Sequence, residues 1–273
     1  MIVIGGGIAG HAVLFSLAQR AKVDRFDTVT LLASDATAPT TSLRSTAVAA
    51  LRGTQVGFSP LGDELVAQWE YAHTLLLKES FSGAEQVSHQ TYCYSSNSAK
   101  RFAHLPQSRS ILPMKLAPDL IVEEPAWVID PAMFLSSIHQ RCRNLGVHTI
   151  HHPVTELTQK DGGWSVRLHS GEVLEAEQVI LTSGFWMHWM REYLVGTPLA
   201  DLVPVQGSYY QWESFALSLP SFSMSLEGTN LIYSAPLKRL ILGATSVKHD
   251  VSLVPDSSQL KQLVEDVAEK LLL

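Results

Sequence analysis

The chain begins with Met1-Ile2-Val3-Ile4-Gly5-Gly6-Gly7-Ile8-Ala9-Gly10, in which a short β-branched run leads directly into a G-x-G-x-x-G turn. In this pattern Gly5 permits the tight turn, Gly7 lets the backbone approach a pyrophosphate, and Gly10 lets a helix pack closely on the strand. The N–H groups at the start of that helix attract an anion. An apolar helical period follows, and the run at 29–32 predicts a second, buried parallel strand. The segment therefore predicts a βαβ unit that binds a dinucleotide.

The whole chain has 273 residues, of which 46% are hydrophobic and 17% are charged. These values are typical of a globular protein with two domains, or with one large domain and an insertion. No apolar stretch is long enough to span a bilayer, and the formal net charge of −6 gives no general attraction to nucleic acid or to an anionic membrane. The two cysteines, Cys93 and Cys142, are far apart and do not indicate a disulfide framework. We therefore expect a soluble, cytoplasmic protein.

Three more helices are indicated by their first residues. Ser59-Pro60 and Asp130-Pro131 each place an N-cap residue before a proline at the first helical position, and Asp256 to Gln259 resembles a capping box. Gly146 is expected to end the second of these helices. The four expected helices each have an apolar face: Ala9, Val13, Leu14, Leu17 and Ala18; Leu61, Leu65, Trp69, Ala72 and Leu76; Phe134, Ile138, Cys142 and Leu145; and Leu260, Leu263, Val264, Val267 and Leu271.

Strands are predicted where β-branched and aromatic runs lie between turn residues. Three short runs joined by glycine turns predict a β-meander, and a buried strand is expected at 179–184, before a small-residue turn. Residues 86–128 are expected to mix short strands with prolines and polar turns, as part of a second domain. The meander strands and the clearest later strands are 154–159, 164–169 and 173–175, then 207–212 and 239–243.

Four segments in this order resemble the glycine oxidase and D-amino-acid oxidase superfamily of FAD-dependent oxidoreductases. They are the Gly5–Gly10 turn, the loop 41–47, the meander leading to 179–186, and Pro204-Val205-Gln206-Gly207. The resemblance covers nearly the whole chain. The loop around 32–35 is also similar to the oxidase half of the bifunctional enzyme that matures the tRNA wobble uridine.

The resemblance implies an α/β fold, with a Rossmann-like FAD-binding domain that carries the meander and an α+β substrate domain built on an antiparallel or mixed sheet. The expected FAD-binding domain comprises 1–85 and 130–190, and the substrate domain comprises 86–129 and 191–273. Family members continue with a further segment that contacts the isoalloxazine, so this chain, which ends at Leu273, is expected to lack it. A partner chain covering that C-terminal surface is one alternative left open.

The resemblance also implies FAD as the cofactor and assigns the residues that contact it. Asp35 is expected to replace the acidic residue that usually binds the ribose hydroxyls, because Ala33 stands at that position. Trp186 either shields the flavin or packs on the sheet. The expected cofactor residues are Gly5, Gly7, Ile8, Ala9, Gly10, Ser34, Asp35, Ser42, Ser45, Thr46, Ala47, Val154, Thr182, Gly184 and Trp186.

The activity implied is dehydrogenation of a C–N bond in an amino acid or secondary amine, by hydride transfer to flavin N5. Such chemistry depends on positioning, so no catalytic residue is assigned. Arg52 is a candidate anchor for a substrate carboxylate or else a surface arginine, while Tyr209 and Tyr233 either line the pocket or pack in the core. Two alternatives remain: a catalytically incomplete subunit that needs a partner, and an oxidase of a tRNA wobble nucleoside.

Three nearby histidines invite comparison with a metal site. His148, His151 and His152 do not have the spacing of a helical i, i+4 pair, and on a strand the last two face opposite sides. We therefore expect no metal at this place. The resemblance implies instead a small-molecule amine or amino acid as the ligand of the protein. Nucleic acid and membranes are not expected partners.

Overall fold

The computed structural model describes residues 1–24, 30–33, 41–51, 60–184, 205–248 and 254–272. The chain forms two compact units, which are described separately. Unit 1 comprises Met1–Ser45, Phe81–Gly83 and Pro131–Leu202, and unit 2 comprises Thr46–Ser80, Ala84–Asp130 and Val203–Leu273. Among the described residues, no helix is both long and apolar enough to cross a membrane.

The units have different boundaries from the domains expected from the sequence. Strand β3 (Val48–Ala50) and helix α2 (Pro60–Glu79) belong to unit 2, although both lie within the expected nucleotide-binding segment 1–85. The physical reason is pairing, because Val48 and Ala50 of β3 lie opposite Val128 and Ala126 in the register of the large sheet.

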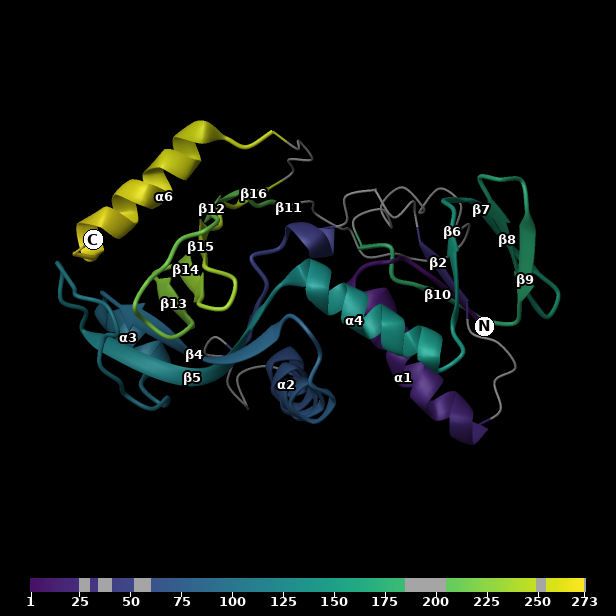
Figure 1. Cartoon of the computed structure of the whole chain (residues 1–273), viewed down its shortest axis with the longest axis horizontal. Coiled ribbons are helices and arrows are strands. Elements are labelled where there is room, and N and C mark those ends of the chain that lie inside the picture. The colour runs from purple at the N-terminus through teal and green to yellow at the C-terminus, as the bar shows by residue number, and fades with distance from the viewer. Residues whose placement is uncertain (25–29, 34–40, 52–59, 185–204, 249–253, 273) are drawn as a thin grey trace. The chain divides into compact units, whose positions relative to one another are not determined.

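Unit 1 is built on a parallel sheet with the strand order β10-β1-β2-β6. The strands are β1 (Ile2–Ile4), β2 (Thr30–Ala33), β6 (His148–His151) and β10 (Val179–Leu181). Helices α1 (Ile8–Asp24) and α4 (Pro131–Asn144) lie side by side in this unit (Figure 1). The predicted βαβ unit and the helix after Asp130 are therefore confirmed.

The predicted meander is also confirmed. Strands β7 (Val154–Lys160), β8 (Gly163–Leu168) and β9 (Val173–Ala176) pair in that order. Their inner residues pack with Ile2 and Ile4 of β1 in one cluster, to which the meander contributes Leu157, Val166 and Leu168. The meander is thus attached to the parallel sheet through the first strand of the chain.

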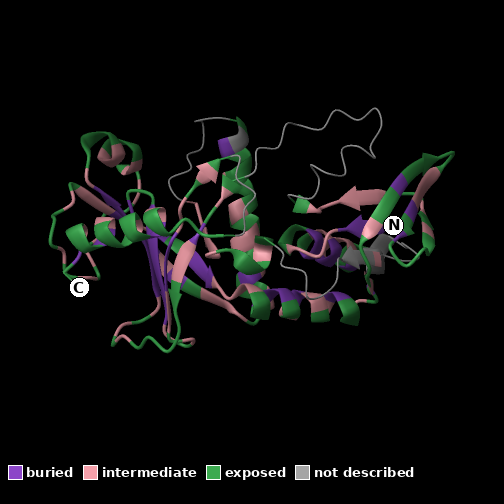
Figure 2. Cartoon of the chain, turned by 90° about the horizontal axis from the view of Figure 1, so that it is seen from above, coloured by how far each residue is buried: buried purple, intermediate pink, exposed green. Residues whose placement is uncertain are grey.

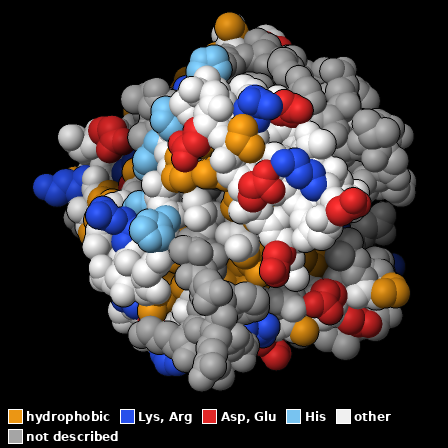
Figure 3. Space-filling model, turned by 90° about the vertical axis from the view of Figure 1, so that its right-hand side faces the viewer, with side chains coloured by type: hydrophobic (Ala, Val, Ile, Leu, Met, Phe, Trp, Pro, Cys, Tyr) orange, Lys and Arg blue, Asp and Glu red, His pale blue; other side chains and the backbone are white. Residues whose placement is uncertain are grey.

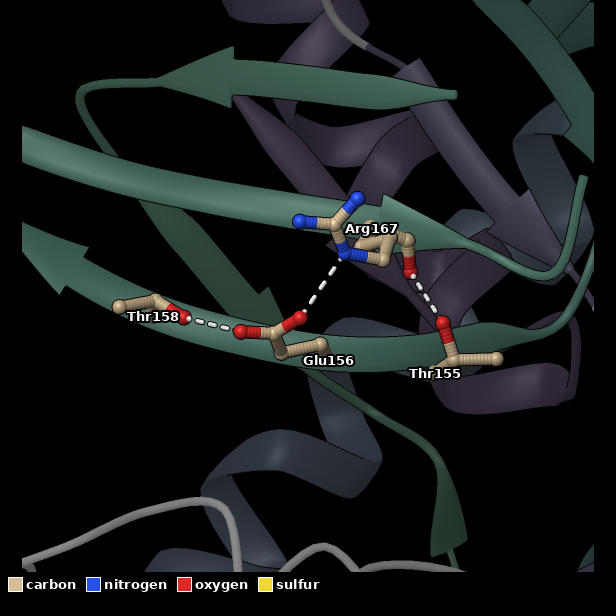
Figure 4. Close-up of polar contacts among 4 residues, drawn as sticks. All are labelled: Thr155, Glu156, Thr158 and Arg167. Carbon is tan, nitrogen blue, oxygen red and sulfur yellow. Dashed lines mark hydrogen bonds and ion pairs between the residues drawn. The ribbon is translucent and has the colours of Figure 1, made fainter. Parts of the chain in front are cut away.

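The outer surface of the meander carries a small polar network. Arg167 Nε on β8 donates to Glu156 Oε2 on β7 at 2.9 Å, and Thr158 Oγ1 donates to the other carboxylate oxygen at 3.1 Å (Figure 4). Thr155 Oγ1 donates to the backbone oxygen of Arg167 at 3.3 Å. These contacts lie next to the irregularity in register between Val154 and Glu156.

The first helix buries a different face from the one expected. Leu14 and Ala18 are buried as predicted, but Ala9 is exposed. His11 and Phe15 are buried in its place, at 6% and 3% exposure. The ring of Phe15 packs edge-on against Phe81, which in turn packs against Phe134 of α4. The short segment 81–83 therefore contributes an aromatic side chain to the core of unit 1.

Unit 2 is built on a seven-stranded mixed sheet with the order β12-β15-β14-β13-β4-β5-β3, in which only β13 and β4 are parallel. Its central strands are largely buried (Figure 2). The short strands β11 (Val205–Gln206) and β16 (Val247–Lys248) form a separate pair. The other strands are β4 (Ala84–Cys93), β5 (Leu120–Ile129), β12 (Tyr209–Trp212), β13 (Phe222–Leu226), β14 (Thr229–Ser234) and β15 (Arg239–Gly243).

The prediction of only short strands in 86–128 is wrong. β4 and β5 each span ten residues and pair along their whole length, with Pro125 opposite Ser88. Helix α3 (Ser96–Phe102) lies in the connection between them. The prolines and polar residues of this stretch interrupt the alternation of apolar and polar residues from which a long strand is predicted. The two strands form nevertheless, because each is stabilised by pairing with the other.

Alternation along the strands gives the large sheet two distinct faces. On one face, which we call face A, Tyr92 and Met224 pack with Val267 and Leu271 at the end of helix α6 (Ser257–Lys270). On the opposite face, face B, a second cluster contains Val87, Ala126, Val128, Ile232 and Ile241.

The last helix is confirmed, with Asp256 accepting hydrogen bonds from the backbone N–H groups of Ser258 and Gln259. After it, Leu271 is buried and the N–H of Lys115 donates to the backbone oxygen of Lys270 at 2.8 Å. Two of the expected inner positions are outside the core, since Val264 is 40% exposed and Leu65 of α2 is 49% exposed.

Candidate functional site

The turn between β1 and α1 needs glycine at two positions for steric reasons. Gly5 has φ +130°, and a Cβ placed there would lie 2.5 Å from the backbone of Thr182. A Cβ at Gly10 would lie 1.9 Å from the backbone oxygen of Gly5. Both glycines therefore bring the start of the helix, the end of β1 and the end of β10 into close backbone contact, as the sequence predicted.

The start of α1 is open to a ligand. Ile8 and Ala9 are exposed, and the N-terminal N–H groups of a helix attract negative charge. The N–H of Ile8 donates to Ser42 Oγ at 3.0 Å, and a Cβ at Gly7 would lie 3.0 Å from the same oxygen. The structure thus brings Ser42, predicted from the sequence as a cofactor residue, to the dinucleotide turn.

Thr182 supports the turn from behind. Its Oγ1 donates to the backbone oxygen of Ile4 at 3.0 Å and lies 3.3 Å from that of Gly5, and its N–H donates to Ile4 O at 2.8 Å. In this geometry Thr182 holds the carbonyl groups of the turn. Gly184, two residues on, is exposed and has φ +58°, a left-handed conformation that favours glycine.

The predicted flavin loop is divided between the two units. Thr41–Arg44 forms a 3-10 turn, η1, in unit 1, followed by the exposed Ser45. Thr46 and Ala47 belong to unit 2, where Ala47 has φ +46° and its backbone oxygen accepts the N–H of Ile129 at 2.9 Å. A non-glycine residue in this left-handed region is uncommon, so the surrounding structure fixes the backbone conformation of Ala47.

The other predicted cofactor residues add little to the geometry of the turn. Val154 begins the meander, where it is half-buried against the cluster that contains Ile2 and Ile4. The remaining predicted cofactor residues and the predicted carboxylate anchor lie outside the described residues: Ser34, Asp35, Trp186 and Arg52.

The two predicted substrate tyrosines have different surroundings. Tyr209 is half-buried on face B, packed against its apolar cluster. Tyr233 is only 1% exposed on face A, and its hydroxyl accepts the N–H of Leu217 at 2.9 Å and lies 3.3 Å from the oxygen of the same residue. Of the two, only Tyr209 has a side chain that reaches the surface.

Sequence reasoning missed two buried histidines. His11 directly follows the last glycine of the turn, and its Nδ1 lies 3.0 Å from the backbone oxygen of Gly7. His89 is fully buried on face B, with Nδ1 2.9 Å from Ser223 Oγ. The available signal for His11 was a polar residue inside an apolar helix. Among the residues that the structure describes, no group of three or more His, Cys, Asp or Glu side chains is arranged to hold a metal ion.

The turn fits the pyrophosphate of FAD. Glycine stands at Gly5, Gly7 and Gly10, where a Cβ would lie 3.0 Å or less from another part of the chain, and Ile8 and Ala9 at the start of α1 are exposed. Gly7, Ile8, Ala9 and Ser42 would hold the diphosphate, and Thr182 would hold the turn in shape.

Comparison with solved structures supports the fold. Glycine oxidase from Geobacillus kaustophilus matches with a TM-score of 0.76 at 16% identity, over 99% of this chain and 77% of that one. NikD, an amino acid oxidase of nikkomycin biosynthesis, matches with a TM-score of 0.73 at 16% identity, over 99% and 77%. The glycerol-3-phosphate dehydrogenase from Bacillus halodurans, complexed with FAD, matches with a TM-score of 0.67 at 14% identity, over 100% and 53%.

The comparison with curated proteins finds no match. A family model does match, and it spans residues 1–272, so it includes both units and the dinucleotide turn. The chain belongs to the DAO family of FAD dependent oxidoreductases.

Proposed function

We propose that the protein dehydrogenates the C–N bond of an amino acid or of a secondary amine. The observation that carries this proposal is that both units, over 99% of the chain, follow the fold of glycine oxidase and of NikD, which is described as an amino acid oxidase. Bound FAD supplies the hydride acceptor, flavin N5, for the carbon next to a neutral amine.

The residues of this chain would act by positioning. The turn at Gly7 and the 3-10 turn at Ser42 would hold the diphosphate and so fix where the flavin lies. Face B of the large sheet would contribute Tyr209 to the substrate surroundings, and Arg52 would pair with a substrate carboxylate. Tyr233 would act only from the core, by holding the segment at Leu217.

A second candidate is dehydrogenation of a C–O bond. It is favoured by the matches of the chain to a glycerol-3-phosphate dehydrogenase and to an L-alpha-glycerophosphate oxidase from Mycoplasma pneumoniae, which cover 53% and 80% of those proteins. The TM-scores of these two matches, 0.67 and 0.71, are lower than the 0.76 of glycine oxidase and the 0.73 of NikD. The amine is therefore the preferred substrate class.

The test is anaerobic reduction of the FAD-loaded protein. We expect loss of the visible flavin absorbance with at least one of glycine, sarcosine, L-proline and a panel of D- and L-amino acids, and none with glycerol-3-phosphate. Reduction by glycerol-3-phosphate and by no amine would overturn the proposal in favour of the second candidate.

The role of Arg52 can be separated from the reaction itself. For a carboxylate-bearing amine, Arg52→Gln is expected to raise the apparent dissociation constant by about tenfold or more, because a bidentate charged contact is lost. The matched control is a secondary amine without a carboxylate, for which the constant is expected to stay unchanged. Equal effects on both substrates would assign Arg52 another role.

A further inference from the structure

Histidines from three elements of unit 1 meet behind the dinucleotide turn. His11 on α1 has Nε2 3.3 Å from Nδ1 of His139 on α4, and the two rings pack edge-on with centroids 5.4 Å apart. The ring centroid of His139 lies 6.4 Å from that of His151 at the end of β6. Figure 3, which views the molecule from the right-hand side of Figure 1, shows histidine side chains at the surface. The three rings lead from the buried His11, beside Gly7, to the exposed His151.

The hydrogen-bond contacts of the two rings indicate which ring nitrogens carry a hydrogen. A carbonyl oxygen only accepts, so the 3.0 Å contact with Gly7 O means that His11 Nδ1 carries a hydrogen. In neutral His11 the other nitrogen, Nε2, is then a bare acceptor. His139 Nδ1 must donate to it, which leaves His139 Nε2 as the site where a further proton can be added without breaking either hydrogen bond.

The surroundings favour the neutral form of both rings in the protein without cofactor. Burial lowers the pKa of His11, against the opposing effect of the Gly7 and Gly6 backbone contacts, and His151 lowers it further. Burial also lowers the pKa of His139, with added effects of His11, His151 and Arg143.

Among the residues that the structure describes, the other groups found beside the pair are cationic or neutral. Arg143 and His148 line a surface depression together with His139 and His151. The thiol of Cys142, 3.9 Å from the backbone oxygen of His11, has its pKa raised to about 11 by burial and stays uncharged. The diphosphate of FAD would therefore be the main negative charge introduced near these rings.

We propose that His11 and His139 form a proton-linked pair that positions the dinucleotide turn and couples FAD binding to the uptake of a proton. The proposal rests on FAD binding and is independent of the substrate proposed above. His11 is a positioning residue, because its ring holds the backbone carbonyl of Gly7 in the dinucleotide turn.

The negative charge of the diphosphate determines that FAD binding takes up a proton rather than releasing one. Two phosphate charges at the start of α1 favour the protonated form of a nearby histidine, so the proton affinity of His139 is higher in the FAD complex than without FAD. Affinity for FAD is then greatest below the pKa of the FAD-free pair and falls as the pH rises through the pKa of the complex. We expect FAD to bind about three- to tenfold more tightly at pH 5.5 than at pH 8, with at most about one proton taken up.

The experiment is calorimetric titration of FAD into the cofactor-free protein at about pH 6.5, in two buffers that differ in ionisation enthalpy. The wild-type protein is expected to take up part of a proton. His139→Gln keeps an amide N–H that can donate to His11 Nε2 but does not titrate, so its proton uptake is expected to vanish while FAD still binds at pH 8. His148→Gln, at an exposed neighbour lining the same depression, is the matched control and is expected to behave like the wild type.

A second measurement keeps the proposal testable if a variant does not fold. Nitrogen-15 NMR of histidine-labelled wild-type protein reports which ring nitrogen carries the hydrogen, and the Nδ1–H form is expected for His11. The Nε2–H form at His11, equal proton uptake by wild type and His139→Gln, or no uptake by the wild type would each overturn the proposal. Failure of every amine to reduce the bound flavin would affect only the function proposed above.

Discussion

The backbone N–H of Ile8 donates to the side-chain oxygen of Ser42 at 3.0 Å, across 34 residues of sequence. Ile8 is the first residue of α1, so its N–H has no acceptor within the helix. Ser42 thereby acts as a capping residue from a distant turn and fixes the 3-10 turn η1 beside the start of the helix. This hydrogen bond joins the loop 41–47 to the glycine turn.

Ser42→Ala is expected to lower the free energy of unfolding of the FAD-free protein by about 0.5–2 kcal/mol, since a helix-capping acceptor is lost. FAD affinity is expected to fall as well, because η1 is no longer held at the turn. Urea unfolding and quenching of FAD fluorescence measure the two effects. Thr41→Ala, in the same 3-10 turn, is the control, and an equal loss in both variants would argue against the capping role.

Substitutions at two glycines of the turn are expected to have different consequences. Gly10→Ala places Cβ 1.9 Å from the backbone oxygen of Gly5, so the strand and helix must separate, with a loss of about 1–3 kcal/mol in stability or more. Gly7→Ala meets only the side-chain oxygen of Ser42, at 3.0 Å, and is expected to leave the fold intact. Its methyl group would crowd the backbone approach proposed for the diphosphate, so FAD affinity should fall by about tenfold or more. A Gly7→Ala protein that binds FAD normally would contradict the assigned site.

The ion pair between Arg239 and Asp130 is expected to stabilise unit 2. The Nη1–Oδ2 distance is 2.8 Å, and each side chain is only 12% exposed. Asp130→Asn removes a charged acceptor from a largely buried cation and should cost about 1.5–3 kcal/mol, measured by urea unfolding. Lys160→Gln removes a comparable pair whose side chains are 51% and 63% exposed, and no measurable change is expected there. Similar losses for the two variants would show that burial does not set the strength of these pairs.

The FAD-free protein is expected to lose stability as the pH falls below 6.5. The pKa values of His11 and His139 are lowered from 6.5 by burial, so below that pH the unfolded chain binds more protons than the native protein. The loss begins at the unfolded pKa and ends once the pH is below the native values. Thermal unfolding at a series of pH values measures it, and His11→Gln should flatten the profile whereas His148→Gln should not. The lowered pKa of Glu123 acts in a separate window, below its usual 4.5.

Parts of the fold could be predicted because they depend on neighbouring residues. The glycine turn, the proline-started helix α4, the cap at Asp256 and the glycine-joined meander are all found as expected. Each of these features is decided by conformational limits within a few residues, such as a positive φ or an N–H without an acceptor.

The pairing of distant strands could not be predicted in the same way. β4 and β5 were hidden by prolines and polar residues, and β13 and β14 were not distinguished from their surroundings. Long strands of this kind are stabilised by partners far away in the sequence, and polar residues on them are tolerated where buried contacts such as His89 with Ser223 satisfy them.

By itself, the sequence determined the dinucleotide turn and the family-like order of segments, because glycine is the residue that permits a left-handed or closely packed backbone. Only the tertiary structure decided which face of α1 is buried, and hence that His11 lies against His139, 128 residues away. The physical reason is that burial depends on what packs against a face: His139 of α4 packs against His11 and Phe81 packs against Phe15, whereas Ala9 stays exposed.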